Sequence, residues 1–260
     1  MRILMIRHAE PDYAADTLTP RGRKEAALLA RRLAGYRLGD VYVSPLGRAR
    51  ETAACALAPL GREAEVLPWL AEFRGRFTDP ETGRPHLPWD LPPRVWSAEP
   101  LLLDPEKWAD LSWFNDGNVR EIWDETVRGV DALMARYGCR KDGPVWRCDR
   151  PHRETITLFC HFGISMAVLA RLINVSPVPL WQRCLTVTSS VTEIISEERI
   201  PGELSFRVIR LGDITHLESA GQPRSSAGLF PECYTGIDST DPGVNGDLPW
   251  GNTDPGLPKE

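Results

Sequence analysis

Short apolar runs alternate with longer amphipathic stretches along the first part of the chain. Residues 4–6 are apolar and end at Arg7 and His8, which indicates a buried strand with charged side chains at its carboxyl end. Apolar positions then recur at helical spacing over residues 20–34, behind a threonine-proline pair that is typical of a helix start. A second apolar run over residues 41–43 completes the pattern of a strand, a helix and a strand.

The alternation returns in the second half of the chain. Helical periodicity is strongest over residues 119–137, and residues 155–160 form an apolar run that ends at His161. A helical pattern follows over residues 163–173, and two strand-like runs separated by turn residues over 185–211 predict a hairpin at the sheet edge. These elements predict an α/β protein with three layers, α/β/α, on a mostly parallel, mixed central sheet.

Three segments depart from this rhythm. Residues 73–117 are rich in proline and large aromatic residues, which predicts an ordered insertion without long regular elements. Residues 139–153 are polar and turn-rich, with His152 expected as an exposed loop residue. Residues 219–260 are dominated by proline, glycine and polar residues, so we expect a disordered tail or an extended strap behind one domain of residues 1–218.

Composition and charge restrict the function classes. With 42% hydrophobic and 26% charged residues, the chain has the composition of a soluble globular protein. Its net charge of -5 argues against a broad surface for nucleic acid or an anionic membrane, so a bound phosphate would occupy a local pocket. No apolar run approaches the roughly 18 residues of a membrane span, and the first strand follows Met1 too closely for a signal peptide, so we expect a cytoplasmic location.

The cysteines favour reduced, mostly buried thiols. They form no Cys-x-x-Cys pattern and no cluster with histidines, so neither a metal site nor a cofactor is expected from them. The cysteines are Cys55, Cys139, Cys148, Cys160, Cys184 and Cys233.

Charged residues at the ends of the apolar runs are suited to an anion. Arg7 and His8 follow the first run, and His161 follows the later run over residues 155–160. Open α/β sheets bind ligands beyond the carboxyl ends of their strands, so the two histidines face one phosphate if their strands are neighbours. The alternative for His161 is a core histidine that is satisfied by the backbone.

A second helix, which the segment over residues 44–52 opens and which is expected to run to Pro59, carries Arg48 in its first turn. The helix dipole disfavours a cation at that end, so Arg48 indicates a bound anion, which the backbone N–H groups of the helix start also favour. The alternative is a surface arginine that pairs with a nearby acid such as Glu51.

Glu72 follows a loosely alternating, strand-like run over residues 64–70. At the apolar end of a strand a carboxyl group is partly desolvated, which raises its pKa and suits it to act as a general acid. The alternative is a solvated loop glutamate paired with Arg74 or Arg76.

At this point the chain resembles the histidine phosphatase superfamily, in its phosphoglycerate-mutase-like branch. Each matching string is short, but the strings occur in the family's order, over most of residues 1–72 and roughly 119–217. The residues that carry the resemblance are Arg7-His8, Leu18-Thr19-Pro20-Arg21-Gly22, Ser44-Pro45-Leu46 with Arg48-Ala49 and Thr52, Leu70-Ala71-Glu72, and Cys160-His161-Phe162-Gly163.

The resemblance implies a metal-independent phosphatase that hydrolyses a small organic phosphomonoester. His8 would attack phosphorus and become phosphohistidine, while Arg7, Arg48 and His161 bind the phosphoryl oxygens and Glu72 protonates the leaving oxygen.

The chain departs from the family at two places. Phe162 stands where a glycine is usual after the histidine, which affects the shape of the pocket. The serine/threonine-asparagine pattern that mutases carry after Arg7-His8 is missing, which argues against mutase activity.

Two other functions stay open at this stage. One is a phosphoglycerate-type mutase, and the other is a phosphate-binding or protein-interaction module without turnover, against which the filled catalytic positions argue. The insertion over residues 73–117 is hypothesised to cap the pocket and to select a bulkier organic phosphate. Alternatively, its aromatic rings pack on the core or form a contact between copies of the chain, a homo-oligomer.

Overall fold

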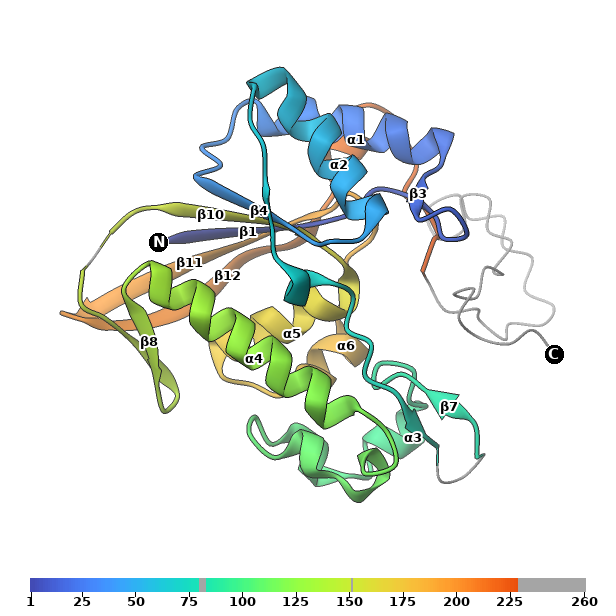
Figure 1. The fold of residues 1–260 in the computed structure, drawn as a ribbon, viewed down its shortest axis with the longest axis vertical. Helices are drawn as coiled ribbons and strands as arrows, with labels where there is room; N and C mark the ends of the chain where they lie inside the picture. Colours follow the sequence, from blue (N-terminus) through green and yellow to red (C-terminus); the bar gives the residue numbers. More distant parts are fainter. Residues whose placement is uncertain (80–82, 151, 229–260) are drawn as a thin grey trace.

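A single mixed sheet runs through the molecule (Figure 1). The computed structural model describes residues 1–79, 83–150 and 152–228. Within these residues the sheet consists of β1 (Arg2–Arg7), β4 (Asp40–Val43), β5 (Glu65–Val66), β8 (Cys139–Asp142), β9 (Val145–Cys148), β10 (Thr155–Cys160), β11 (Val191–Ile200) and β12 (Glu203–Asp213). Two small ribbons pair β2 (Pro11–Asp12) with β3 (Thr17–Leu18) and β6 (Phe77–Thr78) with β7 (Pro85–His86).

The strand order, β5-β4-β10-β1-β11-β12-β9-β8, places the two predicted histidine strands side by side. β10 lies between β1 and β4 and is parallel to both, with Arg7 opposite Cys160. β11 then runs antiparallel to β1, and β12 antiparallel to β11, which confirms the hairpin expected over residues 185–211. Its expected place at the sheet edge is wrong, because β9 and β8 extend the sheet beyond β12. The sheet is therefore mixed, as the sequence predicts.

The helices cover both faces of the sheet (Figure 1). Side chains of successive strand residues point to opposite faces, so Leu4 and Ile6 pack against α1 and α2, whereas Ile3 and Met5 pack against α4 and α5. The three-layer α/β/α class is confirmed. The helices are α1 (Pro20–Leu33), α2 (Gly47–Leu57), α3 (Pro93–Trp96), α4 (Val119–Arg136), α5 (Phe162–Ile173), α6 (Pro177–Arg183) and α7 (Thr215–Glu218). None of the helices described here is long and apolar enough to cross a membrane.

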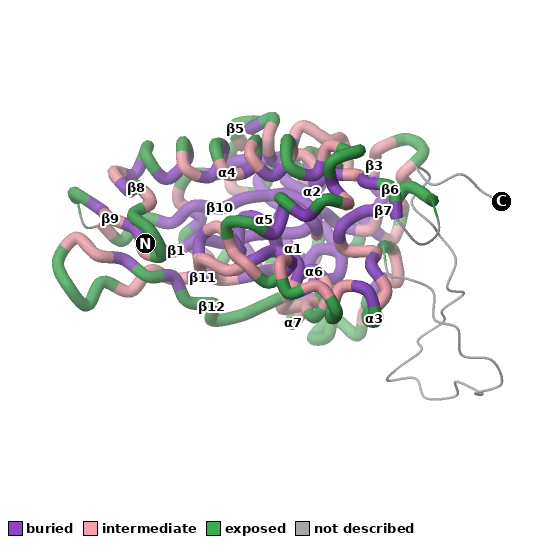
Figure 2. Tube along the Cα trace, turned by 90° about the horizontal axis from the view of Figure 1, so that it is seen from below, coloured by how far each residue is buried: buried purple, intermediate pink, exposed green. Residues whose placement is uncertain are grey.

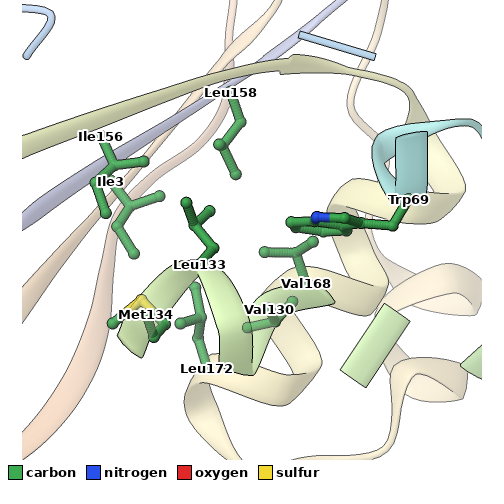
Figure 3. Close-up of a pocket in the computed structure, with 9 residues that line it drawn as sticks. All are labelled: Ile3, Trp69, Val130, Leu133, Met134, Ile156, Leu158, Val168 and Leu172. Atoms are coloured by element: carbon green, nitrogen blue, oxygen red, sulfur yellow. The ribbon is translucent and has the colours of Figure 1, made fainter. Parts of the chain in front are cut away.

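Burial follows this layering (Figure 2). β10 is buried at every residue, whereas most of β12 is exposed because β9 pairs with it only at Glu203 and Leu204. On the α4 and α5 side a small apolar gap of about 10 Å³ remains between the sheet and the helices, where Trp69, Val130 and Val168 point toward each other (Figure 3). A gap of that size is at the lower limit for one water molecule, and its walls are apolar, so it stays dry.

The start of α1 shows the predicted capping. The side chain of Thr19 accepts a hydrogen bond from the backbone N–H of Gly22 at 2.9 Å, and Pro20 occupies the first helical position.

The expectation for residues 139–153 was wrong. They contain the hairpin β8–β9, which extends the sheet beyond β12, rather than polar turns alone. Only three of its strand residues are buried, Cys139, Trp146 and Cys148, so no apolar run marks the strands in the sequence. His152 is half-buried rather than exposed, because its ring Nε2 donates to the Tyr137 carbonyl at 3.0 Å.

The insertion over residues 73–117 is ordered where it is described. Trp108 is fully buried and contacts Trp123 of α4 and Trp181 of α6, with ring centroids 5.3 and 5.4 Å apart. The insertion therefore packs on the main core through this ring, which favours the packing alternative for Trp108. Besides β6, β7 and α3 it contains the 3-10 helices η3 (Pro100–Leu103), η4 (Trp108–Asp110) and η5 (Ser112–Phe114). Of the predicted tail, residues 229–260 lie outside the described part.

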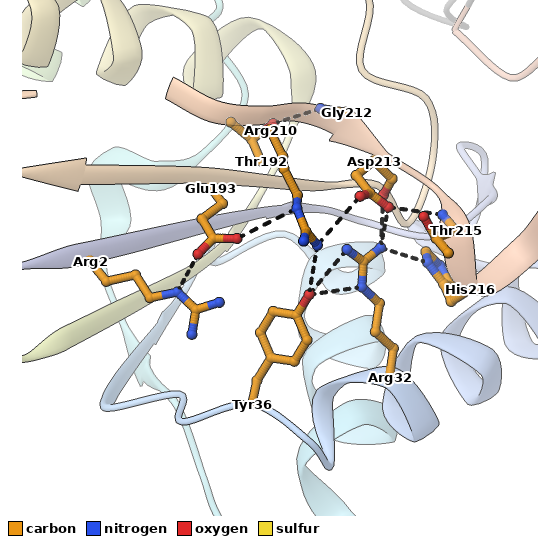
Figure 4. A network of polar contacts seen from close by, with 10 residues as sticks. All are labelled: Arg2, Arg32, Tyr36, Thr192, Glu193, Arg210, Gly212, Asp213, Thr215 and His216. Carbon is orange, nitrogen blue, oxygen red and sulfur yellow. Dashed lines mark hydrogen bonds and ion pairs between the residues drawn. The ribbon is translucent and has the colours of Figure 1, made fainter. Parts of the chain in front are cut away.

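A network of ion pairs and hydrogen bonds connects the C-terminal end of β12 to α1 (Figure 4). Arg32 of α1 forms an ion pair with Asp213 at 2.7 Å and lies 3.3 Å from His216 Nδ1. The other ring nitrogen of His216 lies 3.1 Å from the Ser189 hydroxyl, which agrees with the structural role expected for this histidine. The network thereby fixes the loop before β11, whose Ser189 N–H donates to the His8 carbonyl at 3.0 Å.

Candidate active site

His8 and His161 lie together at the carboxyl ends of β1 and β10. The backbone N–H of His8 donates to the Cys160 carbonyl at 2.9 Å, which continues the parallel ladder by one residue. The two ring centroids are 5.0 Å apart and the rings are tilted by 57°. The neighbouring strands that the two-histidine hypothesis required are therefore present.

The His8 ring is held in one tautomer. Its Nδ1 lies 2.7 Å from the Ala9 carbonyl oxygen. A carbonyl only accepts hydrogen bonds, so Nδ1 carries the hydrogen and Nε2 of the neutral ring carries a lone pair. Burial, reinforced by the charges of Arg7 and Arg48, holds the pKa of His8 well below its ordinary value. His8 is therefore neutral at pH 7 with Nε2 available as a nucleophile.

His161 is fully buried, with one ring nitrogen bonded and the other free. Nε2 lies 2.7 Å from the Ser44 hydroxyl, which in turn accepts the Leu46 N–H at 3.2 Å. Nδ1 has no hydrogen-bond partner among the described residues. When Ser44 donates to Nε2, the hydrogen sits on Nδ1 and can bind an anion. Burial, with the charges of His8 and Arg48, lowers the pKa of His161 well below its ordinary value.

Arg7 lies at the end of β1 and is buried, with 5% of its surface exposed. Its guanidinium donates to the Thr186 carbonyl at 2.5 Å and to the Ala227 carbonyl at 3.4 Å, while Nε has no partner among the described residues. The Phe162 ring lies 5.9 Å from the guanidinium carbon, so the residue that departs from the family pattern forms one wall beside Arg7.

Arg48 lies in the first turn of α2 and pairs with Asp16, with Nη1 2.6 Å from the carboxylate. The alternative prediction, that Arg48 pairs with Glu51, is wrong, because Glu51 pairs with Arg23 at 2.8 Å. The Tyr13 ring lies 5.4 Å from the guanidinium carbon, and the buried Nε of Arg48 has no partner in the described part of the chain.

Glu72 lies where β5 and the 3-10 helix η2 (Pro68–Leu70) lead into the insertion. Its carboxylate accepts the backbone N–H groups of Phe73 at 2.8 Å and Ile164 at 2.9 Å, rather than pairing with Arg74 or Arg76. Burial raises the pKa of Glu72, and the two N–H groups and the arginines only partly oppose it.

The close approach of Glu72 to α5 depends on a glycine. A Cβ on Gly163 would lie 2.8 Å from the Glu72 carboxylate and 2.5 Å from the Trp89 ring. Trp89 in turn lies edge-on to Phe162, with centroids 6.3 Å apart. The insertion therefore reaches the site through Trp89, although Trp108 is buried away from solvent.

Buried polar atoms without partners gather around the histidines. Arg7 Nε, Arg48 Nε and His161 Nδ1 are all hydrogen-bond donors or can become donors, and the charges of both arginines act on His8, His161 and Glu72. Buried donors left without partners are unfavourable, so this arrangement fits an anion such as a phosphoryl group.

The comparisons with known proteins agree with this arrangement. Residues 3–97 match the family model of the histidine phosphatase superfamily, branch 1. Over these residues the chain is similar to the histidine phosphatase superfamily. This match ends before His161, so the second half of the site is described by the geometry above. No curated protein matches the sequence.

Solved structures share the fold of this chain over most of its length. Phosphoserine phosphatase from Entamoeba histolytica is 17% identical, with a TM-score of 0.56 over 83% of this chain and 98% of that one. A mycobacterial glucosyl-3-phosphoglycerate phosphatase is 21% identical, with a TM-score of 0.54 over 81% and 98%. The alpha-ribazole phosphatase from Shigella flexneri is 21% identical, with a TM-score of 0.53 over 82% and 97%. At these identities the likeness establishes the fold.

Two features of this candidate site were not found in the sequence. Ser44 was part of the matching strings but was not assigned a contact, and it is the hydrogen-bond partner of His161. Residues 185–190 were expected to be strand, but β11 begins at Val191 and the loop before it holds Arg7 and His8 through Thr186 and Ser189. Ser189 adopts a left-handed backbone (φ 56°), which no apolar pattern reveals.

Proposed function

We propose that this chain is a phosphatase that hydrolyses a small organic phosphomonoester through a phosphohistidine on His8. The observation that carries the proposal is the tautomer of His8: Nδ1 donates to the Ala9 carbonyl, so the Nε2 lone pair is free to attack phosphorus. The low pKa of His8 supports the same role, because a protonated ring has no lone pair to donate.

In the first step Nε2 of His8 forms a bond to phosphorus while the bond from phosphorus to the leaving oxygen breaks. Arg7, Arg48 and His161 hold the three other phosphoryl oxygens as charge spreads over them. Their unpartnered nitrogen atoms support this assignment. Side chains thereby supply the positive charge that phosphoryl transfer requires, which makes the proposed reaction metal-independent.

Glu72 supplies the proton. Its raised pKa supports a protonated carboxyl group that gives its hydrogen to the departing alkoxide. In the second step the resulting carboxylate takes a proton from water, the water oxygen bonds to phosphorus, and the bond to His8 breaks. His8 and Glu72 both return to their starting states, so the cycle balances.

The organic part of the substrate would lie against Trp89 and Phe162. These two rings are half-buried, contact each other edge to face, and lie beside Glu72, where the leaving group must be. The similar solved structures are named phosphoserine phosphatase, glucosyl-3-phosphoglycerate phosphatase and alpha-ribazole phosphatase, which supports phosphatase activity but not one substrate.

The test is to trap the phosphoenzyme. Wild-type protein mixed with p-nitrophenyl phosphate and quenched in alkali is expected to carry one phosphoryl group, labile in acid, on the peptide that contains His8. His8→Ala is expected to lose both the label and turnover, whereas His86→Ala, in the insertion, keeps both. Turnover at the wild-type rate in His8→Ala, or a phosphoryl group on another residue, would contradict the proposal.

A further inference from the structure

Two cysteines and a histidine meet at the end of the sheet opposite to the active site. Cys139 of β8 and Cys148 of β9 are paired directly across the hairpin, and His152 follows four residues later. One donor atom from each residue lies within 4.8 Å of the other two, and both cysteines are buried. The chain spacings, eight and three residues between the members, match no common metal motif, so the sequence favoured plain thiols.

The backbone carbonyl oxygen of Tyr137 lies beside these three donor atoms and can serve as a fourth ligand of a tetrahedral metal site. The Tyr137 carbonyl lies 3.0 Å from His152 Nε2, 3.7 Å from Cys139 Sγ and 3.8 Å from Cys148 Sγ. In a tetrahedral zinc site the bond lengths of about 2.0–2.3 Å place neighbouring donor atoms roughly 3.3–3.8 Å apart. The three measured distances are close to these edges, and the remaining edges need only small movements.

Without a metal, backbone carbonyls accept the hydrogen atoms of the cluster. The Tyr137 carbonyl accepts from His152 Nε2 and Cys139 Sγ, and the Cys148 thiol, 3.8 Å from this carbonyl, lies nearer to the Arg150 carbonyl at 3.2 Å. A bound cation would replace the hydrogen atoms of both thiols and leave all four atoms as ligands.

Glu154 lies beside the other ring nitrogen of His152. Its backbone N–H donates to Nδ1 at 3.3 Å, and its carboxylate lies 3.5 Å from the same atom. When Nε2 binds a metal, the hydrogen moves to Nδ1, and the carboxylate can accept it in place of the N–H contact, which is the usual arrangement for a metal-bound histidine. The amino group of Met1 donates to the His152 carbonyl at 3.1 Å and holds the segment in place.

We propose that Cys139, Cys148 and His152, with the Tyr137 carbonyl, bind one zinc ion. Two sulfur donors from buried cysteines and one nitrogen donor from half-buried His152, all within 4.8 Å of one another, favour zinc over magnesium or calcium, which prefer oxygen ligands. Binding releases one proton from each thiol, so the two thiolates balance the charge of the ion.

The ion would be structural. It would join the edge hairpin β8–β9, the end of α4 at Tyr137 and the entry to β10, at the opposite end of β1 from His8. With six residues at about 3.3 Å each, β1 separates the two sites by roughly 20 Å. The proposed phosphatase reaction therefore does not depend on this ion.

The experiment uses the full chain with Cys233→Ser, because Cys233 lies outside the described residues. Chelator-treated, reduced protein is titrated with Co²⁺, which reports tetrahedral thiolate ligation by intense visible bands and a near-ultraviolet sulfur-to-cobalt band. We expect one Co²⁺ per chain, displacement by one Zn²⁺, and a higher melting temperature with Zn²⁺. Chelation is expected to leave the hydrolysis of p-nitrophenyl phosphate unchanged, which separates this proposal from the proposed function.

Variants distinguish the cluster from other thiols. The double variant Cys139→Ser/Cys148→Ser is expected to abolish the sulfur-to-cobalt band, whereas Cys184→Ser, at the end of α6, keeps it. Glu154→Gln keeps the ligands and the spectrum at saturation but is expected to weaken Co²⁺ binding about 10-fold to 100-fold, and it remains informative if the double variant fails to fold. A pale octahedral spectrum, a band that survives in the double variant, or a disulfide between Cys139 and Cys148 in metal-free reduced buffer would overturn the proposal.

Discussion

Burial shifts the pKa values of two groups of the candidate site in opposite directions. It removes charge from His8, whose pKa is lowered, and it keeps a proton on Glu72, whose pKa is raised. The proposed nucleophile and the proposed acid therefore have their working protonation states over the same pH range. At the scale of single residues, one physical cause prepares both halves of the chemistry.

Glu72→Gln tests the acid. Without a transferable proton, hydrolysis of an alkyl phosphate is expected to slow by about 10²–10⁴-fold, while p-nitrophenyl phosphate, whose leaving group needs little protonation, loses much less. In the wild type, kcat/KM should rise with pH as His8 loses its proton and fall as Glu72 loses its own, so the variant should lack the fall. If Glu72→Gln slowed the hydrolysis of both substrates equally, Glu72 would not be the general acid, and Glu10 would be the next residue to test.

Glu25 makes stability depend on pH. Its side chain is fully buried, and burial raises its pKa from 4.5 to about 7. The folded state therefore holds a proton that the unfolded state releases, so the free energy of unfolding falls as pH rises from 4.5 to about 7, by up to about 3 kcal/mol. Glu25→Gln should remove this fall, as measured by urea unfolding at about pH 5 and pH 8. Exposed Glu125→Gln is the control, and an unchanged pH dependence in Glu25→Gln would contradict the prediction.

At the scale of elements, two helices can pack closely where one of them has a glycine, which carries no side chain. α4 and η2 approach each other at Gly129, where a Cβ would lie 2.3 Å from the Trp69 ring. The same ring borders the apolar gap in Figure 3. The glycine therefore serves packing, although it weakens the helix that contains it.

Gly129→Ala is expected to lower the free energy of unfolding. Alanine favours an exposed helix position by about 0.8–1.0 kcal/mol over glycine. Here the clash with the Trp69 ring should cost about 1–3 kcal/mol and reverse the sign. Chemical denaturation measures the net effect. In a Trp69→Ala background the clash is absent, so the same substitution should stabilise the protein; destabilisation in both backgrounds would refute the packing explanation.

At the scale of the whole molecule, the insertion joins the layer that covers one face of the sheet. The Trp108 ring contacts Phe73, Phe114, Trp123 and Trp181, which come from the insertion, α4 and α6. Trp89, by contrast, reaches Phe162 and the site. The insertion thus has a packing part and a part that borders the proposed substrate position.

Trp108→Ala should lower the free energy of unfolding by about 3–5 kcal/mol, because a fully buried ring leaves a cavity. Trp108→Phe should be much milder, since the indole N–H is buried without a partner among the described residues and its loss offsets part of the lost volume. Thermal unfolding of both variants checks the order. A Trp108→Ala protein as stable as the wild type would show that the insertion does not support the core.

Local patterns in the sequence were sufficient for much of the fold and of the candidate site. Strand ends marked by Arg7-His8 and by His161, and the helix start at Thr19, are set by neighbouring residues, because strand alternation and helix capping act over a few positions. Arg48 and Glu72 needed the family resemblance as well, and the roles of all five predicted site residues stay a proposal.

Only the tertiary structure decided how distant segments meet. The partner of Arg48 is Asp16 instead of Glu51, the carboxylate of Glu72 binds the N–H of Ile164, and the hairpin β8–β9 brings Cys139 and Cys148 together. Each of these contacts joins segments that the fold brings together in space. Ion pairing, burial and ligand geometry depend on the distances between atoms in three dimensions. These distances cannot be calculated from the spacing of the residues along the chain.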